Sequence, residues 1–309
     1  AFHMKTGVIY CPNHWGFKSQ KKKHDEIIDA LDKYLPGYDF VQSESADSVE
    51  RLVNMMIDND YHNIVVAGGD SALNDVVNCL MKRDSNVRNI VKIAMIPNGV
   101  VNDFASYWGL TKKTHADCVK VIKAGRVKRV DVGCVKYNDK YSTCHHRYFI
   151  NCINIGLVAS LQNLRSRTRS LLGSRTLSYI TSAMLLITQR LGYKMRLKIN
   201  GEEISKNVMS ICVGNSYGYG QTPSAVPYNG LLDVSVIAPS QMKQFFAGLK
   251  LFLSRRFLMH SDVSAYRTKK VNVLSAPHAH VAVDGRVVAS VRGEYEIFVV
   301  PEAINLIIP

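Results

Sequence analysis

The chain has 309 residues, of which 47% are hydrophobic and 21% are charged. These values exclude a disordered, collagen-like or coiled-coil chain, and at roughly 150 residues per domain the length predicts about two domains. Lysine and arginine (39) exceed aspartate and glutamate (25) by fourteen. This excess favours an anionic partner, which is a nucleotide, a phospholipid surface or a nucleic acid.

The cysteines argue for a reducing compartment. There are seven of them, none in a CxxC pair, so neither a zinc site nor a disulfide framework is expected.

No apolar run reaches the roughly 18 to 20 residues that a membrane-spanning helix needs, and the first residues do not read as a secretory signal. We therefore expect a cytoplasmic protein.

The first part of the chain alternates short apolar runs with longer helical periods, which predicts a parallel α/β sheet. The expected strands are residues 6–11, 38–42, 63–69 and 91–97, and the expected helices are about 25–34, 48–57, 74–81 and 114–123.

After residue 128 the pattern changes to strands separated by turn residues, which predicts an antiparallel β domain. The expected strands are residues 129–135, 147–156, 194–200, 207–215, 231–237, 269–276, 280–290 and 295–301. Two inserted helices are expected at about 159–191 and 240–257. The predicted domains are therefore residues 4–128, α/β and nucleotide-binding, and 129–309, a β-rich substrate domain.

The expected strand at 63–69 runs directly into Gly68, Gly69, Asp70 and Ser71, and a helical segment follows. Glycines at a strand-to-helix turn allow close backbone approach, and free N–H groups at a helix start attract an anion. The pattern fits a phosphate cradle; a simple tight turn with Asp70 in the helix cap is the alternative.

A second loop has the same organisation, with strand 91–97 followed by Gly99, Asn102 and Asp103. Both loops emerge at the carboxyl edge of a parallel sheet, where ligands of open α/β sheets bind. Asp70 and Asp103 are expected to face one site there, and two carboxylates suit a Mg²⁺ ion whose other ligands are phosphate and water.

These motifs resemble the diacylglycerol kinase and sphingosine kinase superfamily. GGDSALNDVVNCL resembles its GGDGTxNEVxNGL motif, and IPNGVVNDFASYWGL resembles PxGTxNDFAR. VDVG, FINCINIGLVA, YNGLLDVSVI and VDGRVV follow in the family's order, so the likeness covers essentially the whole chain. It implies a bacterial-type, two-domain lipid kinase with ATP and Mg²⁺ between the domains, and last residues that return to the first domain.

The resemblance also implies roles for individual residues. Asp284 of VDGR matches the base that takes the proton of the lipid hydroxyl, although Asp-Gly is also a favoured hairpin turn. Asp70 and Asp103 match carboxylates that organise magnesium, Asp70 being credited with base chemistry in sphingosine kinases, and Asp233 matches a structural magnesium position. The expected nucleotide-binding residues are Asn13, Gly68, Gly69, Asp70, Ser71, Asn74, Gly99, Asn102 and Asp103.

The sequence departs from the family in both phosphate loops. In these loops Ser71 replaces a glycine, and Ala72 and Val100 replace threonines. Elsewhere, Arg286 replaces the glutamate of DGE, and CPNHWG at residues 11–16 stands where the family has an NPxxG phosphate loop. Two hydroxyls that each donated to a charged phosphate would contribute about 3 to 6 kcal/mol together. Asn13, His14, Lys18 or the lysines at 21–23 are candidates to compensate. The alternative function is a kinase-derived lipid-binding or regulatory protein with weakened or lost phosphotransfer.

Two segments combine basic and apolar residues as peripheral membrane helices do. Their basic residues are Arg165, Arg167, Arg169 and Arg175 in the first, and Lys243, Lys250, Arg255 and Arg256 in the second. We expect peripheral association with an anionic membrane that holds the lipid substrate; an ordinary core with a solvated rim is the alternative. No nucleic-acid partner is expected. The sequence does not decide whether the lipid is a diacylglycerol, a sphingoid base or a ceramide. It also leaves open whether the chain forms a homodimer.

Overall fold

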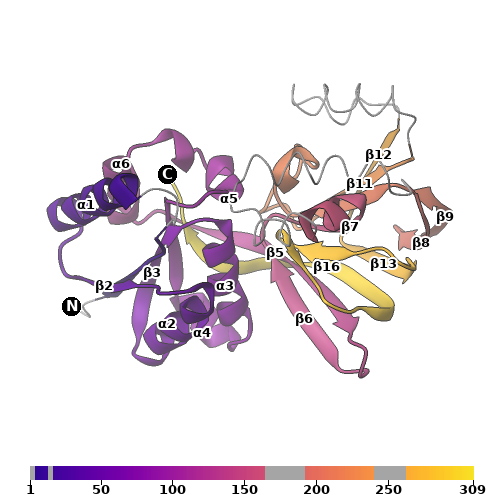
Figure 1. The fold of residues 1–309 in the computed structure, drawn as a ribbon. Coiled ribbons are helices and arrows are strands. Elements are labelled where there is room, and N and C mark those ends of the chain that lie inside the picture. Colours follow the sequence, from indigo (N-terminus) through magenta and orange to yellow (C-terminus); the bar gives the residue numbers. More distant parts are fainter. Residues whose placement is uncertain (1–3, 13–16, 164–191, 240–261) are drawn as a thin grey trace. The chain divides into compact units, whose positions relative to one another are not determined.

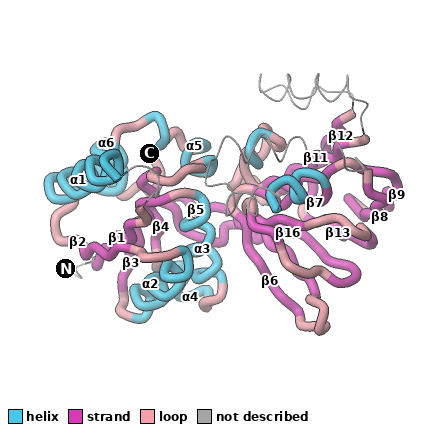
Figure 2. The backbone as a smooth tube through the Cα atoms, in the orientation of Figure 1, coloured by secondary structure: helices cyan, strands magenta, loops and turns pink. Residues whose placement is uncertain are grey.

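The computed structural model describes residues 4–12, 17–163, 192–239 and 262–309 (Figure 1). The chain forms two compact units, one of residues 1–132 together with 301–309 and one of residues 133–300. Figure 2 shows that most of the described helices belong to the first unit, whereas the second unit is built mainly of strands. Among the described residues, no helix is both long enough and apolar enough to cross a membrane.

The first unit is built on a parallel sheet in the order β2-β1-β3-β4, and the end of β16 pairs in parallel with β4. Its central strands are apolar on both faces because helices cover both sides of such a sheet. The strands are β1 (Lys5–Tyr10), β2 (Tyr38–Gln42), β3 (Tyr61–Gly68), β4 (Lys92–Pro97) and β16 (Arg292–Ile307).

Two pairs of helices cover the two faces of this sheet: α1 packs with α6, and α2 packs with α3 (Figure 1). α6 begins at a Thr114 cap, whose hydroxyl accepts the Asp117 N–H, and ends at Gly125 in the left-handed conformation, as helix-end signals predict. The helices are α1 (Phe17–Tyr34), α2 (Ala46–Asp58), α3 (Asp70–Met81), α4 (Ser85–Ile90), α5 (Asp103–Tyr107), η1 (Leu110–Lys112) and α6 (His115–Ala124).

The second unit is an antiparallel β-sandwich. One sheet has the order β12-β11-β10-β7-β14-β15, and the other includes β13, β8 and β9 beside β16, and the β5–β6 hairpin. The strands are β5 (Val127–Asn138), β6 (Cys144–Phe149), β7 (Cys152–Gly156), β8 (Tyr193–Ile199), β9 (Glu202–Val208), β10 (Ser210–Gly214), β11 (Leu232–Ile237), β12 (Val263–Thr268), β13 (Lys270–Ser275), β14 (Val281–Val283) and β15 (Arg286–Val287).

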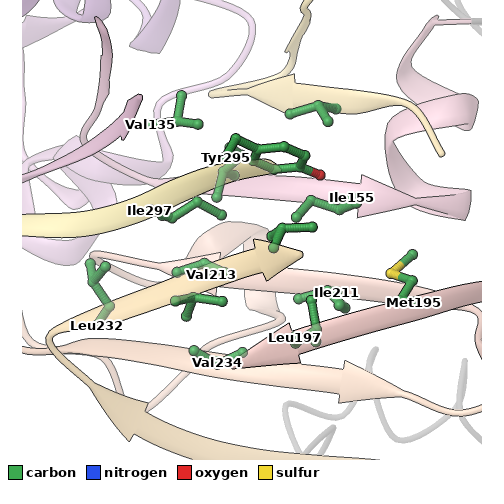
Figure 3. Packing of buried hydrophobic residues seen from close by; sticks show 14 of the residues in the cluster. Val135, Ile155, Met195, Leu197, Ile211, Val213, Leu232, Val234, Tyr295 and Ile297 are labelled. Carbon is green, nitrogen blue, oxygen red and sulfur yellow. The ribbon is translucent and has the colours of Figure 1, made fainter. Parts of the chain in front are cut away.

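Alternating side chains of both sheets form the core of the sandwich (Figure 3). In β8, for example, Met195 and Leu197 are buried while Arg196 between them is exposed, the period-two pattern of a strand with one face in the core. Tyr295 of β16 is also part of this core. The α/β domain followed by an antiparallel β-sandwich confirms the predicted fold class.

Several predicted elements differ from the structure. The single strand expected at 147–156 is two strands, β6 and β7, interrupted at Ile150 and Asn151. The strand expected at 207–215 is interrupted at Met209, and the polar strand β9 before it was missed because its side chains are mostly exposed. Of the two inserted helices, 164–191 and 240–261 lie outside the described residues, together with their basic residues.

Candidate functional site

The loops after β1, β3 and β4 are joined by hydrogen bonds at the carboxyl edge of the parallel sheet. Cys11 N donates to Ala67 O at 2.8 Å, and Asn98 N donates to Gly68 O at 3.0 Å. Asn98 Nδ2 also donates to Cys11 O at 3.4 Å. Because this edge is where open α/β sheets bind ligands, the predicted phosphate loops lie in the expected place within the first unit.

The two predicted phosphate loops touch through their glycines. A Cβ placed on Gly99 would lie 2.3 Å from Gly69 Cα, and one placed on Gly69 would lie 2.8 Å from Val101 O. Both distances are far shorter than a carbon contact allows, so neither position can hold a side chain without a shift of backbone. Gly69 also caps α3 with an extended backbone. The glycines are therefore required by the approach of one loop to the other.

Asp70 connects the first loop to the second. Its carboxylate is buried, with 5% of the residue exposed, and accepts the N–H groups of Asp103 at 2.9 Å and Phe104 at 3.3 Å. The Asp70 N–H in turn donates to Val101 O at 2.9 Å. Asp70 thus holds the start of α5, as a capping carboxylate does, and brings Asp103 beside it.

The second loop is also closed by its own side chain. Asn102 Oδ1 accepts the Gly99 N–H at 3.1 Å, and Asn102 Nδ2 donates to Gly99 O at 2.9 Å. Asn102, predicted to contact the nucleotide, therefore shapes the loop, and Asp103 follows as the first residue of α5.

The remaining predicted nucleotide residues differ in their surroundings. Ser71 is exposed at the start of α3, whereas Asn74 is buried and its Oδ1 accepts from Asn78 Nδ2 at 3.1 Å. Asn13 and His14 lie outside the described residues.

Burial raises the pKa of the nearby Cys11 thiol to about 11, so this thiol is protonated at neutral pH. Lys21 and Lys22 are exposed on α1.

The first loop fits an anion with a divalent cation. The N-terminal N–H groups of α3 attract negative charge, and the Asp70 carboxylate lies at the same helix start. Mg²⁺ is bound through one or two carboxylates, substrate phosphates and water, so Asp70 and Asp103 suffice on the protein side. Among the described residues, no three or more metal-ligating side chains are grouped together.

Asp284 lies in the second unit, in a two-residue turn between β14 and β15. Val283 pairs with Arg286, and Asp284 and Gly285 have positive φ angles of 46° and 81°. A two-residue hairpin with positive φ at both positions is the turn that Asp-Gly favours. The turn interpretation of this dipeptide is therefore confirmed.

The turn does not explain where the Asp284 side chain lies. The residue is buried, with 7% exposed, and its carboxylate accepts three backbone N–H groups: those of Ile150 at 2.8 Å, Asn151 at 2.9 Å and Cys152 at 3.0 Å. The interruption between β6 and β7 directs these N–H groups to the carboxylate. Asp284 thus joins its turn to the FINCINIG segment.

Asp233 has a cationic partner of its own. Its carboxylate accepts from both arms of the Arg267 guanidinium, with Arg267 Nε at 2.9 Å and Nη2 at 3.3 Å, and the two residues are cross-strand neighbours in β11 and β12. Arg267 Nη2 also donates to Ser224 O. Because the guanidinium takes both carboxylate oxygens, the surroundings of Asp233 do not fit the predicted structural magnesium, and we do not propose one there.

Sequence reasoning missed three polar neighbours of the Asp284 turn: Asn151, Gln162 and Tyr219. Tyr219 lies in the glycine-rich turn Gly218–Gly220. Asn151 and Gln162 carry no such signal, since one interrupts an apolar strand pattern and the other lies in an expected helix.

Comparisons with known proteins agree with this architecture. Residues 7–135 match the family described as "Diacylglycerol kinase catalytic domain", and residues 151–308 match the "YegS C-terminal NAD kinase beta sandwich-like domain". A protein of Staphylococcus carnosus (strain TM300), named "Putative lipid kinase", is 22% identical over 295 residues, which cover 92% of this chain and 91% of that protein.

Two solved structures share the fold. The crystal structure of "a putative diacylglycerol kinase from Bacillus anthracis str. Sterne" has a TM-score of 0.73 at 18% identity and covers 100% of this chain and 98% of its own. Yeast NADH kinase complexed with NADH has a TM-score of 0.56 at 10% identity, covering 99% of this chain and 84% of its own.

Proposed function

The chain belongs to the family that joins a diacylglycerol kinase catalytic domain to a YegS C-terminal NAD kinase beta sandwich-like domain, and we propose that it is an ATP-dependent lipid kinase. It transfers the γ-phosphoryl group of ATP to a hydroxyl of a lipid such as a diacylglycerol, a sphingoid base or a ceramide. Peripheral association with an anionic membrane is part of this proposal, because the substrate must be taken from a lipid surface.

The contact between the two glycine loops carries the proposal. Gly69 and Gly99 leave no room for side chains between them, and the Asp70 carboxylate fixes the second loop by two backbone hydrogen bonds. A simple strand-to-helix turn needs no such link to another loop. Backbone N–H groups at the start of a helix are, by contrast, what a polyphosphate binds, and the exposed Ser71 lies at the start of α3.

Each loop residue then has a role in the transfer. The backbone of Gly68 to Ser71 binds the phosphates, and Asp70 and Asp103 are the residues that would hold magnesium. The bound ion would supply charge neutralisation for the phosphates. Phosphoryl transfer depends mainly on positioning and electrostatic stabilisation, which agrees with a site made of rigid backbone and a few carboxylates.

Asp284 is our candidate for the group that accepts the hydroxyl proton. The three N–H groups that it binds fix its carboxylate in one position, and a general base must be held within hydrogen-bond reach of its proton. The same bonds make Asp284 a structural anchor, so the two roles have to be separated by experiment.

The test is phosphorylation of a lipid panel with radiolabelled ATP and Mg²⁺. We expect a labelled lipid product that requires both the lipid and the ion. Asp103→Asn should reduce its formation strongly, whereas Asp60→Asn, at an exposed turn, serves as the matched control. If no hydroxylated lipid is labelled at any magnesium concentration, the proposed activity is wrong.

One observation favours a second candidate, a lipid-binding protein without phosphotransfer. Ala72 is buried directly behind the first loop, and Val100 lies in the second, where the family has hydroxyl side chains. Neither can donate to a phosphate. Lipid binding without ATP binding would support this alternative.

A further inference from the structure

The outer face of one sheet of the β-sandwich is basic, and its clearest row of cations lies on β8. Lys194, Arg196 and Lys198 are exposed and alternate with buried side chains of the sandwich core. Successive side chains of a strand point to opposite faces of the sheet, so these three cations share the face that is turned away from the core. Two residues of a strand span about 7 Å, which sets the spacing of the charges along the row.

The neighbouring strands of the same sheet extend this row. Lys270 of β13 and Lys136 of β5 also stand between core residues of their strands, so they lie on the outer face. Both approach the same carboxylate of β16, with Lys270 Nζ 2.5 Å from Glu296 Oε2 and Lys136 Nζ 3.9 Å from Glu296 Oε1. One carboxylate therefore faces two lysines.

The carboxylates of this face do not balance its cations. Glu203 of β9 lies opposite Lys198, but its Oε1 accepts from Arg196 Nε at 3.0 Å and Nη2 at 2.7 Å. Lys194 and Lys198 belong to none of the ion pairs between described residues. The outward cations are Lys136, Lys194, Arg196, Lys198 and Lys270, and the outward carboxylates are Glu203, Glu294 and Glu296.

The β5–β6 hairpin adds an exposed tyrosine at the edge of this sheet. Tyr141 is 76% exposed, and Lys140 Nζ lies 4.9 Å from the centroid of its ring. Asp139 fixes the turn, because its Oδ1 accepts the N–H groups of Tyr141 at 2.8 Å and Thr143 at 3.0 Å. Tyrosine and lysine side chains are both favoured at the boundary between a membrane and water.

We propose that this basic face, which consists of the outward side chains of β5, β16, β13 and β8 together with the Tyr141 turn, is the surface that lies on an anionic membrane. The inference rests on the membrane association in the proposed function. Lipid headgroups form an extended negative surface, and each lipid can move to a cation. Such a surface matches charges that are spread over several strands, whereas a nucleic acid holds its phosphates along one fixed path. All these residues belong to the second unit.

The test is cosedimentation of the full chain with vesicles of phosphatidylcholine, with and without phosphatidylglycerol. We expect tighter binding to the anionic vesicles, which weakens as salt screens the charges. Each lysine near such a surface contributes a factor of about five to binding. The double variant Lys194→Thr/Lys198→Thr should therefore bind about 25-fold more weakly. Lys112→Thr/Lys113→Thr, at exposed positions of the first unit, removes the same charge and is the matched control, which should bind like the wild type.

Tyr141→Ser should weaken vesicle binding by a factor that salt does not change, because contact of an aromatic ring with lipid is not screened. Circular dichroism checks that each variant is folded. If Lys194→Thr/Lys198→Thr binds anionic vesicles as tightly as the wild type, the inference is wrong. It is also wrong if the wild type does not distinguish the two kinds of vesicle, or binds duplex DNA in their place.

A separate assay in neutral detergent micelles distinguishes this inference from the proposed function. If a lipid is phosphorylated in the micelles while the two lysines have no effect on vesicle binding, the basic face is wrong and the kinase assignment stands. If the lysines control vesicle binding but no lipid is phosphorylated, the basic face stands and the kinase assignment is wrong.

Discussion

Substitution of Asp284 by asparagine should destabilise the second unit as well as affect activity. The carboxylate accepts three backbone N–H groups at 2.8 to 3.0 Å in a buried position. Asparagine has one oxygen, which can replace the bonds to Asn151 and Cys152, but its NH₂ group then faces the N–H of Ile150. Two donors oppose each other where one charged hydrogen bond existed.

The expected loss follows from these three bonds. A hydrogen bond to a charged group contributes about 1.5 to 3 kcal/mol and a neutral one about 0.5 to 1.5 kcal/mol. Two bonds lose their charge assistance, at about 1 kcal/mol each, and the third is lost altogether. We therefore expect Asp284→Asn to lower the free energy of unfolding by about 3 to 5 kcal/mol.

Urea denaturation followed by circular dichroism measures this change. Asp60→Asn is the matched control: Asp60 also has a positive φ, of 60°, and is exposed, so its substitution should alter stability by less than about 0.5 kcal/mol. A loss below about 1 kcal/mol for Asp284→Asn would show that the three N–H groups do not depend on the carboxylate. Turnover must be compared at a temperature where both proteins are folded, since unfolding alone would abolish it.

Three further predictions concern other parts of the chain. Gly99→Ala should lower ATP affinity at least tenfold by calorimetry, because its Cβ would lie 2.3 Å from Gly69 Cα; unchanged affinity would refute the two-loop site. Tyr295→Phe should raise the free energy of unfolding, measured by urea denaturation, by about 1 to 2 kcal/mol. The reason is that the buried Tyr295 hydroxyl has no hydrogen-bond partner among the described residues. Burial raises the pKa of Tyr295, so ionisation above about pH 10 favours the unfolded wild type and the advantage of phenylalanine should grow there; a constant difference would contradict this. Maleimide should label the exposed Cys144 first, and the fast phase of labelling should disappear in Cys144→Ser. The other thiols should react slowly, because burial raises the pKa of Cys79 and Cys118 to about 11 and of Cys134 to about 12. Rapid labelling of a buried thiol would count against the core packing.

Local patterns made the position of the two glycine loops predictable. Gly68 and Gly69 directly follow a buried strand and precede a helix, and Gly99 stands in the same position after the next strand of the sheet. The rules for strand ends and helix starts act over a few residues, so they apply to the sequence without knowledge of tertiary contacts. Register between β3 and β4 then brings the two loops together.

The surroundings of Asp284 could not be predicted in the same way. Its carboxylate binds N–H groups more than 130 positions earlier in the chain, and nothing in VDGR indicates that Ile150 and Asn151 interrupt a strand. The apolar run 147–156 favours one continuous strand, but the buried carboxylate stabilises the break. Likewise, Asp233 gave no sign of its partner Arg267, which lies 34 positions away on the neighbouring strand.

Asp70 and Asp284 use their carboxylates alike, since each holds the backbone of a distant segment. A loss of activity on substitution therefore does not by itself show that either residue takes part in the reaction. Asp103 offers the contrast, since it is partly exposed, and the helix dipole at the start of α5 stabilises its charge by about 0.3 to 1 kcal/mol. We expect Asp70→Asn to lower both the free energy of unfolding, by about 1 to 3 kcal/mol, and ATP affinity, because the amide cannot accept both N–H groups of α5. Asp103→Asn should lose turnover with a smaller loss of unfolding free energy than Asp70→Asn. If urea denaturation finds the two variants equally stable, Asp70 does not hold the second loop, and its role is with the ligand instead.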